Sequence, residues 1–382
     1  MKKVFAIVLA MMLVLSAAAM AESVKIGVFE PASGDSGAGG KQEMLGMQYA
    51  NKETPTVEIG GETYDVELIY ADNGSDTTKA PSAANTLVDA GVSVVLGSYG
   101  SGVSIAGSDI FKNANIPAIG VTCTNPQVTA GNSHYFRVCF LDPFQGTVLA
   151  NYASKELGAT VAYTLGELGN DYDQGLCTYF KQAFEGLGGT VMHEDFPTGT
   201  ADFNSYLTNA AGIGAQVFFC PVSIAYSTQI VQQAASQNVA FPILGSDTLD
   251  SNVVANAAKG TNVQVIITTF YQEGAAPEFD EGFKAWLAED SEAMTNNGGN
   301  DMISAVSAMG YDAYYTALEA LKAAGTTDSK AVMDTLPSVT YDGVSGHIEF
   351  DETGDAIRNA AFIKKINNET GDWEFVAEQT VD

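Results

Sequence analysis

The sequence predicts an α/β protein of two lobes, each built on a doubly wound parallel sheet. Three observations predict this fold class: strand and helix patterns alternate along the chain, one strand–loop–helix–strand unit occurs twice, and 382 residues suffice for two domains. The two copies of the unit begin at Gly91 and Gly214, 123 residues apart. Because ligands bind beyond the carboxyl ends of parallel strands, each lobe should offer a polar rim to a ligand.

The first lobe should contain five strands with helices between them. Apolar runs and alternating patterns predict the strands, and Gly91 closes the last helix before the repeated unit. The helix of that unit should end in the turn 113–117, which contains asparagine and proline. The expected strands are 24–29, 64–70, 91–96, 118–122 and 135–140, and the expected helices include 44–50 and 80–90.

A second alternation begins at once and predicts the other lobe. The expected strands are 160–165, 190–196, 214–219, 243–247 and 263–270, and the expected helices include 174–187 and one that ends in the turn 237–242. From Phe279 the pattern changes to helices, and short strands at 346–350 and 361–366 follow. No segment is long and polar enough to let two domains move independently.

The first 21 residues have the pattern of a secretory signal peptide. Lys2 and Lys3 precede an apolar run at 4–15, and small residues lead to a cleavage site before Glu22. The run is shorter than the ~20 residues that cross a bilayer, so we expect a soluble, periplasmic or extracellular protein. No cysteine follows the small residues, so the pattern indicates no lipid anchor.

The chain is strongly acidic, with 46 Asp and Glu against 17 Lys and Arg. Cleavage would remove two lysines and no acid, and so change the formal charge from −29 to −31. This charge repels phosphate backbones and anionic lipid, which argues against nucleic-acid and membrane partners. A cationic or zwitterionic ligand would not be repelled.

The four cysteines do not have the paired close spacing of a zinc site. Cys123 and Cys139 lie near the ends of two strands that should be neighbours, so a disulfide between them is possible, as is one between Cys177 and Cys220. Buried free thiols are an equally good interpretation. We expect no cofactor and no metal, and a monomer.

Two enzyme classes fit the sequence poorly. The segment 34–41 resembles a phosphate-binding P-loop, but five residues separate Gly34 from Gly40 and Gln42 follows the lysine, so we expect a flexible loop that covers the ligand. A secreted serine hydrolase could use Ser101 or Ser104, but neither lies in a Gly-x-Ser-x-Gly elbow. The three histidines, His134, His193 and His347, lie in or next to predicted strands.

The remaining polar residues at the strand ends suit the recognition of an amino acid. An α-carboxylate needs hydroxyls and backbone amides, which Ser98, Ser101 and Thr124 can supply from glycine-containing loops. An α-ammonium needs carbonyls and a carboxylate, and Asp247 lies at the matching strand end of the other lobe. Asp247 could instead be a helix N-cap, and Tyr172 could cover the ligand or pack at the rim.

These residues, and others along the mature chain, resemble the type I periplasmic binding proteins of the branched-chain amino acid family, the receptors of ABC importers. The most specific stretches are 26–29 with 34–35, 95–101, 122–126, 136–138 with Asp142 and 145–146, 170–175, 245–247 and 350–355.

The resemblance implies a role for each predicted site residue. Ser101 would bind the carboxylate, with its neighbours Tyr99 and Gly100 beside it. The other implied contacts are an amide and hydroxyl from Thr124, a carbonyl from Thr122 to the ammonium, a contact from Tyr172 and the countercharge from Asp247. Cys220-Pro-Val-Ser223 differs from the glycine and aromatic residues common there, and the cysteines do not reproduce the family's best-known disulfide.

The resemblance also implies three crossings between the lobes, near Leu141, 270–271 and Phe350. The N-terminal lobe would then comprise 22–141 and 271–349, and the C-terminal lobe 142–270 and 350–382. Closure of the lobes on a branched-chain or other aliphatic amino acid would deliver it to membrane permease subunits. Two alternatives stay open: a receptor for an amide, urea or other small polar solute, and the secreted serine hydrolase.

Overall fold

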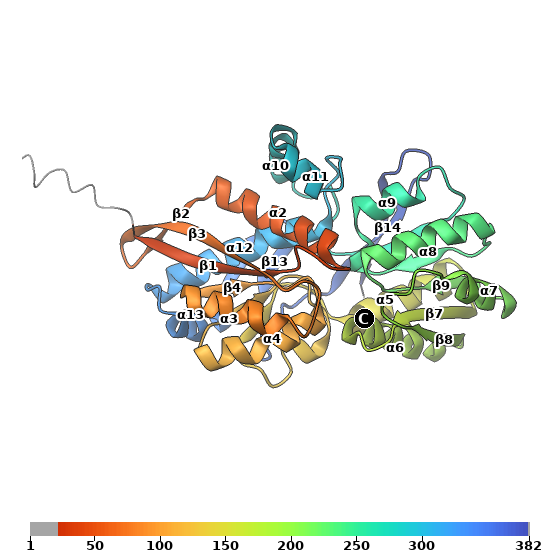
Figure 1. The fold of residues 1–382 in the computed structure, drawn as a ribbon, viewed down its shortest axis with the longest axis horizontal. Helices are drawn as coiled ribbons and strands as arrows, with labels where there is room; N and C mark the ends of the chain where they lie inside the picture. The colour runs from red at the N-terminus through yellow and green to blue at the C-terminus, as the bar shows by residue number, and fades with distance from the viewer. Residues whose placement is uncertain (1–21, 381–382) are drawn as a thin grey trace, which may run out of the picture.

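The computed structural model describes residues 22–380, so the predicted signal peptide lies outside the described residues. Figure 1 shows two halves side by side along the long axis, each with a sheet between layers of helices. The first sheet has six strands in the order β2-β3-β1-β4-β5-β6. Their bounds are β1 Ser23–Glu30, β2 Thr56–Ile59, β3 Glu62–Asp72, β4 Val94–Leu96, β5 Ala118–Gly120 and β6 Tyr135–Arg137.

Helices cover both faces of the first sheet. In Figure 1, α2 lies on one side of the strands and α3 and α4 lie on the other, while α12 packs closely against α2. A small hairpin, β12 Thr340–Gly343 with β13 Gly346–Glu349, packs against α12. The helices of this half are α2 Gly37–Glu53, α3 Ala80–Ala90, α4 Ser101–Ala114, α10 Pro277–Glu289, α11 Ser291–Asn296, α12 Ala305–Ala324 and α13 Ser329–Thr335.

The second sheet has seven strands in the order β15-β14-β11-β10-β9-β7-β8. The strands are β7 Val161–Glu167, β8 Thr190–Phe196, β9 Val217–Phe219, β10 Ile243–Gly245, β11 Val265–Thr269, β14 Ala360–Ile366 and β15 Trp373–Thr380. The helices are α5 Asp142–Asn151, α6 Asp171–Gly186, α7 Asn204–Gly212, α8 Ile224–Gln237 and α9 Asn252–Ala258. None of the helices in the described part of the chain is both long and apolar enough to cross a membrane.

The apolar core lies on both faces of each sheet. Val28, Leu45 and Leu318 belong to a buried cluster on the α2 and α12 side of the first sheet. Phe29 and Phe111, whose rings meet edge to face, belong to a cluster on its α3 and α4 side. The near-continuous apolar character of the central strands follows from this double burial.

The repeated unit forms the same structure in both halves. In the first, α4 ends at Asn115 with φ 57°, and in the second, α8 ends at Asn238 with φ 53°. Asparagine tolerates this left-handed conformation better than most residues, so it reverses the chain after each helix. Each unit then ends in a short buried strand, β5 or β10. The residues after this strand and the loop before the helix lie at the same edge of the sheet.

Edge strands are where the predicted fold and the structure differ. The sheets are mixed: β2 is antiparallel to β3, and β14 and β15 run antiparallel to the neighbours they pair with. Neither β2 nor β15 was predicted, and nor were α7 and α9. Half of β2 is exposed and β15 contains no buried residue, so their patterns lack the strong apolar signal of the central strands.

The predicted flexible loop at 34–41 is wrong for most of its length, because α2 begins at Gly37. The glycines in this segment allow other groups to pack closely against the start of α2. A Cβ on Gly39 would lie 2.2 Å from Cζ of Tyr99, so only glycine lets the tyrosine ring lie against this turn of α2.

The chain passes between the two sheets three times, after β6, after β11 and after β13. The third passage differs from the expectation that residues from 350 onward lie in the second lobe. The peptide N–H of Ala356 donates to the carbonyl of Arg137 at 2.9 Å, and Asp355 is bridged to Arg137, so this segment still pairs with β6 of the first sheet.

Candidate ligand-binding site

A cavity of about 450 Å³ lies between the two halves, at the carboxyl ends of the strands. Loops after β1, β3, β4 and β5 line it from the first half, and loops after β7, β8, β9 and β10 line it from the second. The lining residues are Pro31, 34–36, 74–77, 99–103, Thr122, 167–173, Thr198, Ser223, Asp247 and Thr248.

Six of the seven predicted site residues line this one cavity: Tyr99, Gly100, Ser101, Thr122, Tyr172 and Asp247. Thr124 does not. It is fully buried behind the lining, and its hydroxyl has no hydrogen-bond partner among the described residues. Ser98 is also buried outside the lining, where its hydroxyl accepts a hydrogen bond from Asn73.

Asp247 is a buried carboxyl group in the cavity lining that the protein holds in place by hydrogen bonds. It is the first residue of the 3-10 helix η3 (Asp247–Leu249), and Ser246 occupies the N-cap position, so the N-cap interpretation of Asp247 is wrong. Its Oδ1 accepts hydrogen bonds from Nε2 of Gln145 and from the hydroxyl of Tyr172, both at 2.7 Å. Its Oδ2 is buried and has no partner among the described residues. One oxygen therefore holds the carboxylate in place while the other is free to meet a ligand.

Gln145 is a site residue that sequence reasoning missed. From α5 it binds Asp247 twice, because its Oε1 also accepts the peptide N–H of Asp247 at 2.9 Å. The hydroxyl of Thr268 on β11 donates to the same Oε1 at 2.7 Å. The one signal in the sequence was that Gln145 lies in a stretch that resembles the family, 136–138 with Asp142 and 145–146.

Burial shifts the pKa of the Asp247 carboxyl group. It raises the pKa of Asp247 to about 6, and the negative charge of Asp250 adds to the effect, while the hydrogen bonds from Tyr172 and Gln145 oppose it. Near neutral pH the group is therefore largely ionised. It is then a desolvated negative charge, and a cationic ligand group can compensate for the missing water.

Ser101 combines two features that favour a carboxylate. It is the first residue of α4, where backbone N–H groups have no partner within the helix and the helix dipole favours negative charge. Its Oγ accepts the peptide N–H of Asn125 at 3.1 Å, which leaves the hydroxyl proton available for a ligand.

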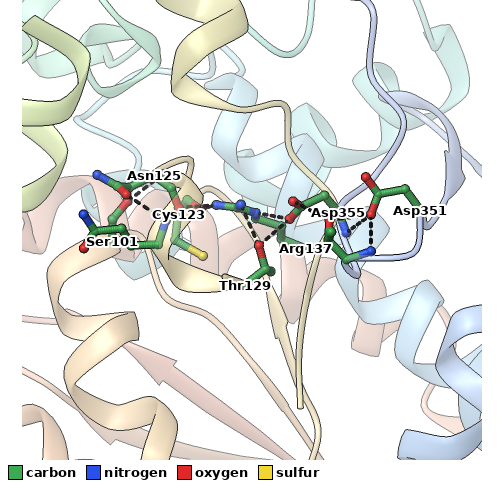
Figure 2. A network of polar contacts seen from close by, with 9 residues as sticks. Ser101, Cys123, Asn125, Thr129, Arg137, Asp351 and Asp355 are labelled. Carbon is green, nitrogen blue, oxygen red and sulfur yellow. Dashed lines mark hydrogen bonds and ion pairs between the residues drawn. The ribbon is translucent and has the colours of Figure 1, made fainter. Parts of the chain in front are cut away.

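The loop that carries Thr122 and Asn125 is held by Arg137, as Figure 2 shows. The guanidinium of Arg137 donates to the carbonyls of Cys123 and Asn125 at 2.8 and 2.5 Å. It also donates to Oδ1 of Asp355 at 2.5 Å and to the hydroxyl of Thr129 at 2.9 Å. A buried ion pair therefore connects the segment after β13 to the loop that touches Ser101.

A pair of buried carboxyl groups, Glu30 and Glu43, contacts two of the lining residues. The hydroxyl of Thr122 donates to Oε2 of Glu43, and Oε2 of Glu30 accepts the peptide N–H of Tyr99 at 2.7 Å. Burial raises the pKa of Glu43 to about 7 and that of Glu30 well above its ordinary value, where the charge of Glu43 contributes as well. Nothing in the sequence pattern distinguished these two residues from other acidic residues.

The two halves are in contact across the cavity. The Tyr99 hydroxyl donates to the carbonyl of Thr248 at 3.0 Å, and Nδ2 of Asn125 donates to the carbonyl of Asp171 at 2.8 Å. The hydroxyl of Tyr226 lies 3.1 Å from Oδ2 of Asp35. Hydrogen bonds therefore link the two halves beside the cavity.

The residues that serine hydrolysis needs do not come together. The hydroxyl of Ser104 donates to the carbonyl of Gly100 at 2.8 Å, and none of the histidines lies among the residues that line the cavity. Within residues 22–380, no group of three or more His, Cys, Asp or Glu could hold a metal ion. All four cysteines are buried free thiols, and burial raises the pKa of Cys123 to about 11.

Comparison with known proteins agrees with this architecture. The sequence profile of one family, described as periplasmic binding protein, matches residues 23–371. The Leu/Ile/Val-binding protein homolog 3 of Brucella melitensis is 29% identical over 353 residues, which cover 89% of this chain and 90% of that protein. The amino acid binding protein of Pseudomonas aeruginosa is 28% identical over 359 residues, 93% of this chain and 92% of that protein.

Two solved structures are similar over nearly the whole chain. The leucine binding protein LivK of Thermotoga maritima is 30% identical with a TM-score of 0.81, and the match covers 94% of this chain and 99% of that one. LivJ of Streptococcus pneumoniae, a branched-chain amino acid transporter substrate binding protein in complex with isoleucine, is 25% identical with a TM-score of 0.81 and the same coverage.

Proposed function

The chain belongs to the periplasmic binding protein family, as a type I member of its branched-chain amino acid group; from this we propose that it is the receptor of an ABC importer for a free amino acid. It is a solute-binding protein and not an enzyme. We further propose that it acts outside the cytoplasm and delivers its ligand to membrane permease subunits.

The observation that carries the proposal is the unpartnered Oδ2 of Asp247, a residue that lines the cavity together with Ser101 of the other half. A buried carboxylate oxygen without a donor is costly, and an α-ammonium would supply that donor together with the opposite charge. The α-carboxylate would then meet Ser101 and the first N–H groups of α4. The carbonyl of Thr122 and the ring of Tyr172 complete the proposed contacts, and Tyr99 and Gly100 flank them.

Thr124 has a different place in this proposal. Thr124 is fully buried and does not belong to the cavity lining, so we propose no direct ligand contact for its hydroxyl. Its carbonyl accepts the peptide N–H of Asp142 at 3.1 Å, at the start of α5. We propose that Thr124 supports the loop between Thr122 and Asn125.

Ligand binding would shift the protein toward the closed form. The contacts at the cavity come from both halves, so an open form could make only some of them with the ligand. We propose that the halves move about the three passages of the chain, with boundaries near 141, 270 and, because 350–356 pair with β6, between 356 and β14.

Closure can be measured by small-angle X-ray scattering of the mature chain. We expect the radius of gyration to fall when saturating amino acid is added, because hinge closure brings the two halves together. Equal radii with and without a ligand that calorimetry shows to be bound would argue against hinge closure.

Binding should weaken as the pH falls through about 6. Asp247 must be ionised to pair with an ammonium, and burial raises its pKa to about 6. Below that pH each further unit should cost about tenfold in affinity, because a proton must be released on binding. Calorimetry between pH 5 and 8 tests this, and the Asp247→Asn variant should lose the pH dependence around 6.

A receptor for an amide, urea or another small polar solute remains the second candidate. Such a ligand has no ammonium. Its neutral N–H group could donate a hydrogen bond to Oδ2 of Asp247 but would not supply the opposite charge. A thermal-shift panel of amino acids, amides, urea and polyols separates the two candidates. Stabilisation by amides but by none of the amino acids would favour the second.

A further inference from the structure

The cavity carries more negative charge than an α-ammonium requires, and from its arrangement we propose that the bound amino acid has a cationic side chain. This inference rests on the proposed function and names the ligand class for the same cavity. The names of the relatives above suggest leucine, isoleucine and valine instead, so the two ligand classes can be compared directly.

Six carboxyl groups line the cavity, and the described lining contains no Lys, Arg or His. For three of the six, neighbouring parts of the structure account for an acidic residue at that position. Asp76 lies 3.8 Å from Nζ of Lys79, and Asp171 and Asp173 lie in the first turn of α6, where the helix dipole favours acids. The other three, Asp35, Glu167 and Asp247, form no ion pair within residues 22–380.

Asp35 and Glu167 face each other across the cavity from opposite halves. The hydroxyl of Tyr226 lies 3.1 Å from Oδ2 of Asp35 and 3.1 Å from Oε1 of Glu167. A phenol has one proton, so it can donate to only one of these two carboxylates. The other carboxylate is left with a like charge nearby and no donor from Tyr226, an arrangement that a cation between the lobes would relieve.

A second observation also points to a polar ligand group. Ser223, from the loop after β9, lines the cavity, is only 8% exposed and has an Oγ without a hydrogen-bond partner among the described residues. A hydroxyl buried in this way fits a ligand that carries N–H groups and suits an aliphatic side chain poorly.

Apolar lining is sparse. Besides the two tyrosines, only Pro31, Val103 and Leu168 offer sizeable apolar side chains, and Leu168 is 61% exposed. A pocket for leucine would bury its isobutyl group against hydrophobic side chains. Here Asp247 can serve the α-ammonium while Asp35 and Glu167 serve a second, distal cation, which matches a dibasic amino acid.

Calorimetry at pH 7.5 with lysine, arginine and ornithine, compared with leucine and norleucine, tests the inference. Norleucine is the matched control because it has the chain of lysine without the distal ammonium. We expect at least one dibasic amino acid to bind about tenfold or more tightly than norleucine. Tighter binding of leucine or norleucine than of every dibasic amino acid would overturn the inference and leave the proposed function intact.

Two variants locate the effect. Glu167→Gln and Asp35→Asn should each reduce the ratio of lysine affinity to norleucine affinity by about threefold to tenfold. Asp35 is exposed and Glu167 is buried, so the Asp35 variant carries the smaller risk of misfolding. Glu58→Gln, an exposed position on β2, makes the same change in net charge and should leave the ratio unaltered. An unaltered ratio in both cavity variants would contradict the inference.

The diamines putrescine and cadaverine separate the inference from the function on which it rests. They offer two cations and no carboxylate, so we expect them to bind more weakly than ornithine and lysine. Diamine binding as tight as that of the amino acids would support the cationic subsite and contradict the α-carboxylate contact at Ser101. Binding of none of the amino acids or diamines would overturn both.

Discussion

Replacing Asp247 with alanine should weaken amino-acid binding by about 2 to 5 kcal/mol in calorimetry at pH 7.5. Asp247 is 1% exposed, and its Oδ1 is already held by Gln145 and Tyr172, so the carboxylate does not need to be ordered when the ligand arrives. Its removal would leave the ligand ammonium desolvated without a countercharge. Most of the loss should appear as faster dissociation.

Two further variants separate the charge from the shape of the site. Asp247→Asn keeps the size of the side chain, so it should lose most of the same affinity if charge is what matters. Asp89→Ala, at an exposed position on α3, removes one negative charge far from the cavity and should bind normally. Unchanged affinity in Asp247→Ala, in a variant that still unfolds cooperatively, would remove the proposed role.

Replacing Arg137 with alanine should lower the free energy of unfolding by about 3 to 5 kcal/mol. The side chain is fully buried, and its guanidinium donates to Asp355, to Thr129 and to two loop carbonyls. Its loss would leave the carboxylate of Asp355, itself 6% exposed, without a cation, and two buried carbonyls without a donor. Urea unfolding followed by circular dichroism measures the change.

A surface ion pair provides the control for Arg137. Lys330 and Asp334 lie 2.7 Å apart on α13, with both side chains more than half exposed. Lys330→Ala should therefore change stability by about 0 to 1 kcal/mol. A similarly small change in Arg137→Ala would show that the network in Figure 2 contributes little to the stability of the fold.

The variant Arg137→Ala should also weaken ligand binding. The guanidinium holds the carbonyls of Cys123 and Asn125, and the N–H of Asn125 positions the hydroxyl of Ser101. Figure 2 shows this chain of contacts running from Ser101 to Asp355. Stability and affinity are therefore coupled through one loop.

The repeated unit was predictable because its signals are local. Buried strands, a helical period and an asparagine turn each depend on neighbouring residues, and both copies end their helices at an asparagine with positive φ. Parallel strands then bring the following loops to one edge, which is why six of the seven predicted site residues line one cavity.

The residues that were missed depend on contacts between distant parts of the chain. Gln145 and Asp247 are 102 positions apart, Tyr226 and Asp35 are 191 apart, and Arg137 and Asp355 are 218 apart. No periodicity relates such positions. The edge strands β2 and β15 were not predicted for a different reason, because a largely exposed strand has few apolar residues to form a recognisable pattern.

By itself, the sequence determined the fold class, the two repeated units and the residues that the strand ends present to a ligand, because hydrophobic periodicity and turn chemistry act over a few residues. Only the tertiary structure decided which carboxylates are buried together, which of them lack a cation, and which oxygen of Asp247 is free. Desolvation and pairing depend on the groups that folding brings within a few ångströms, and those groups come from both halves of the chain.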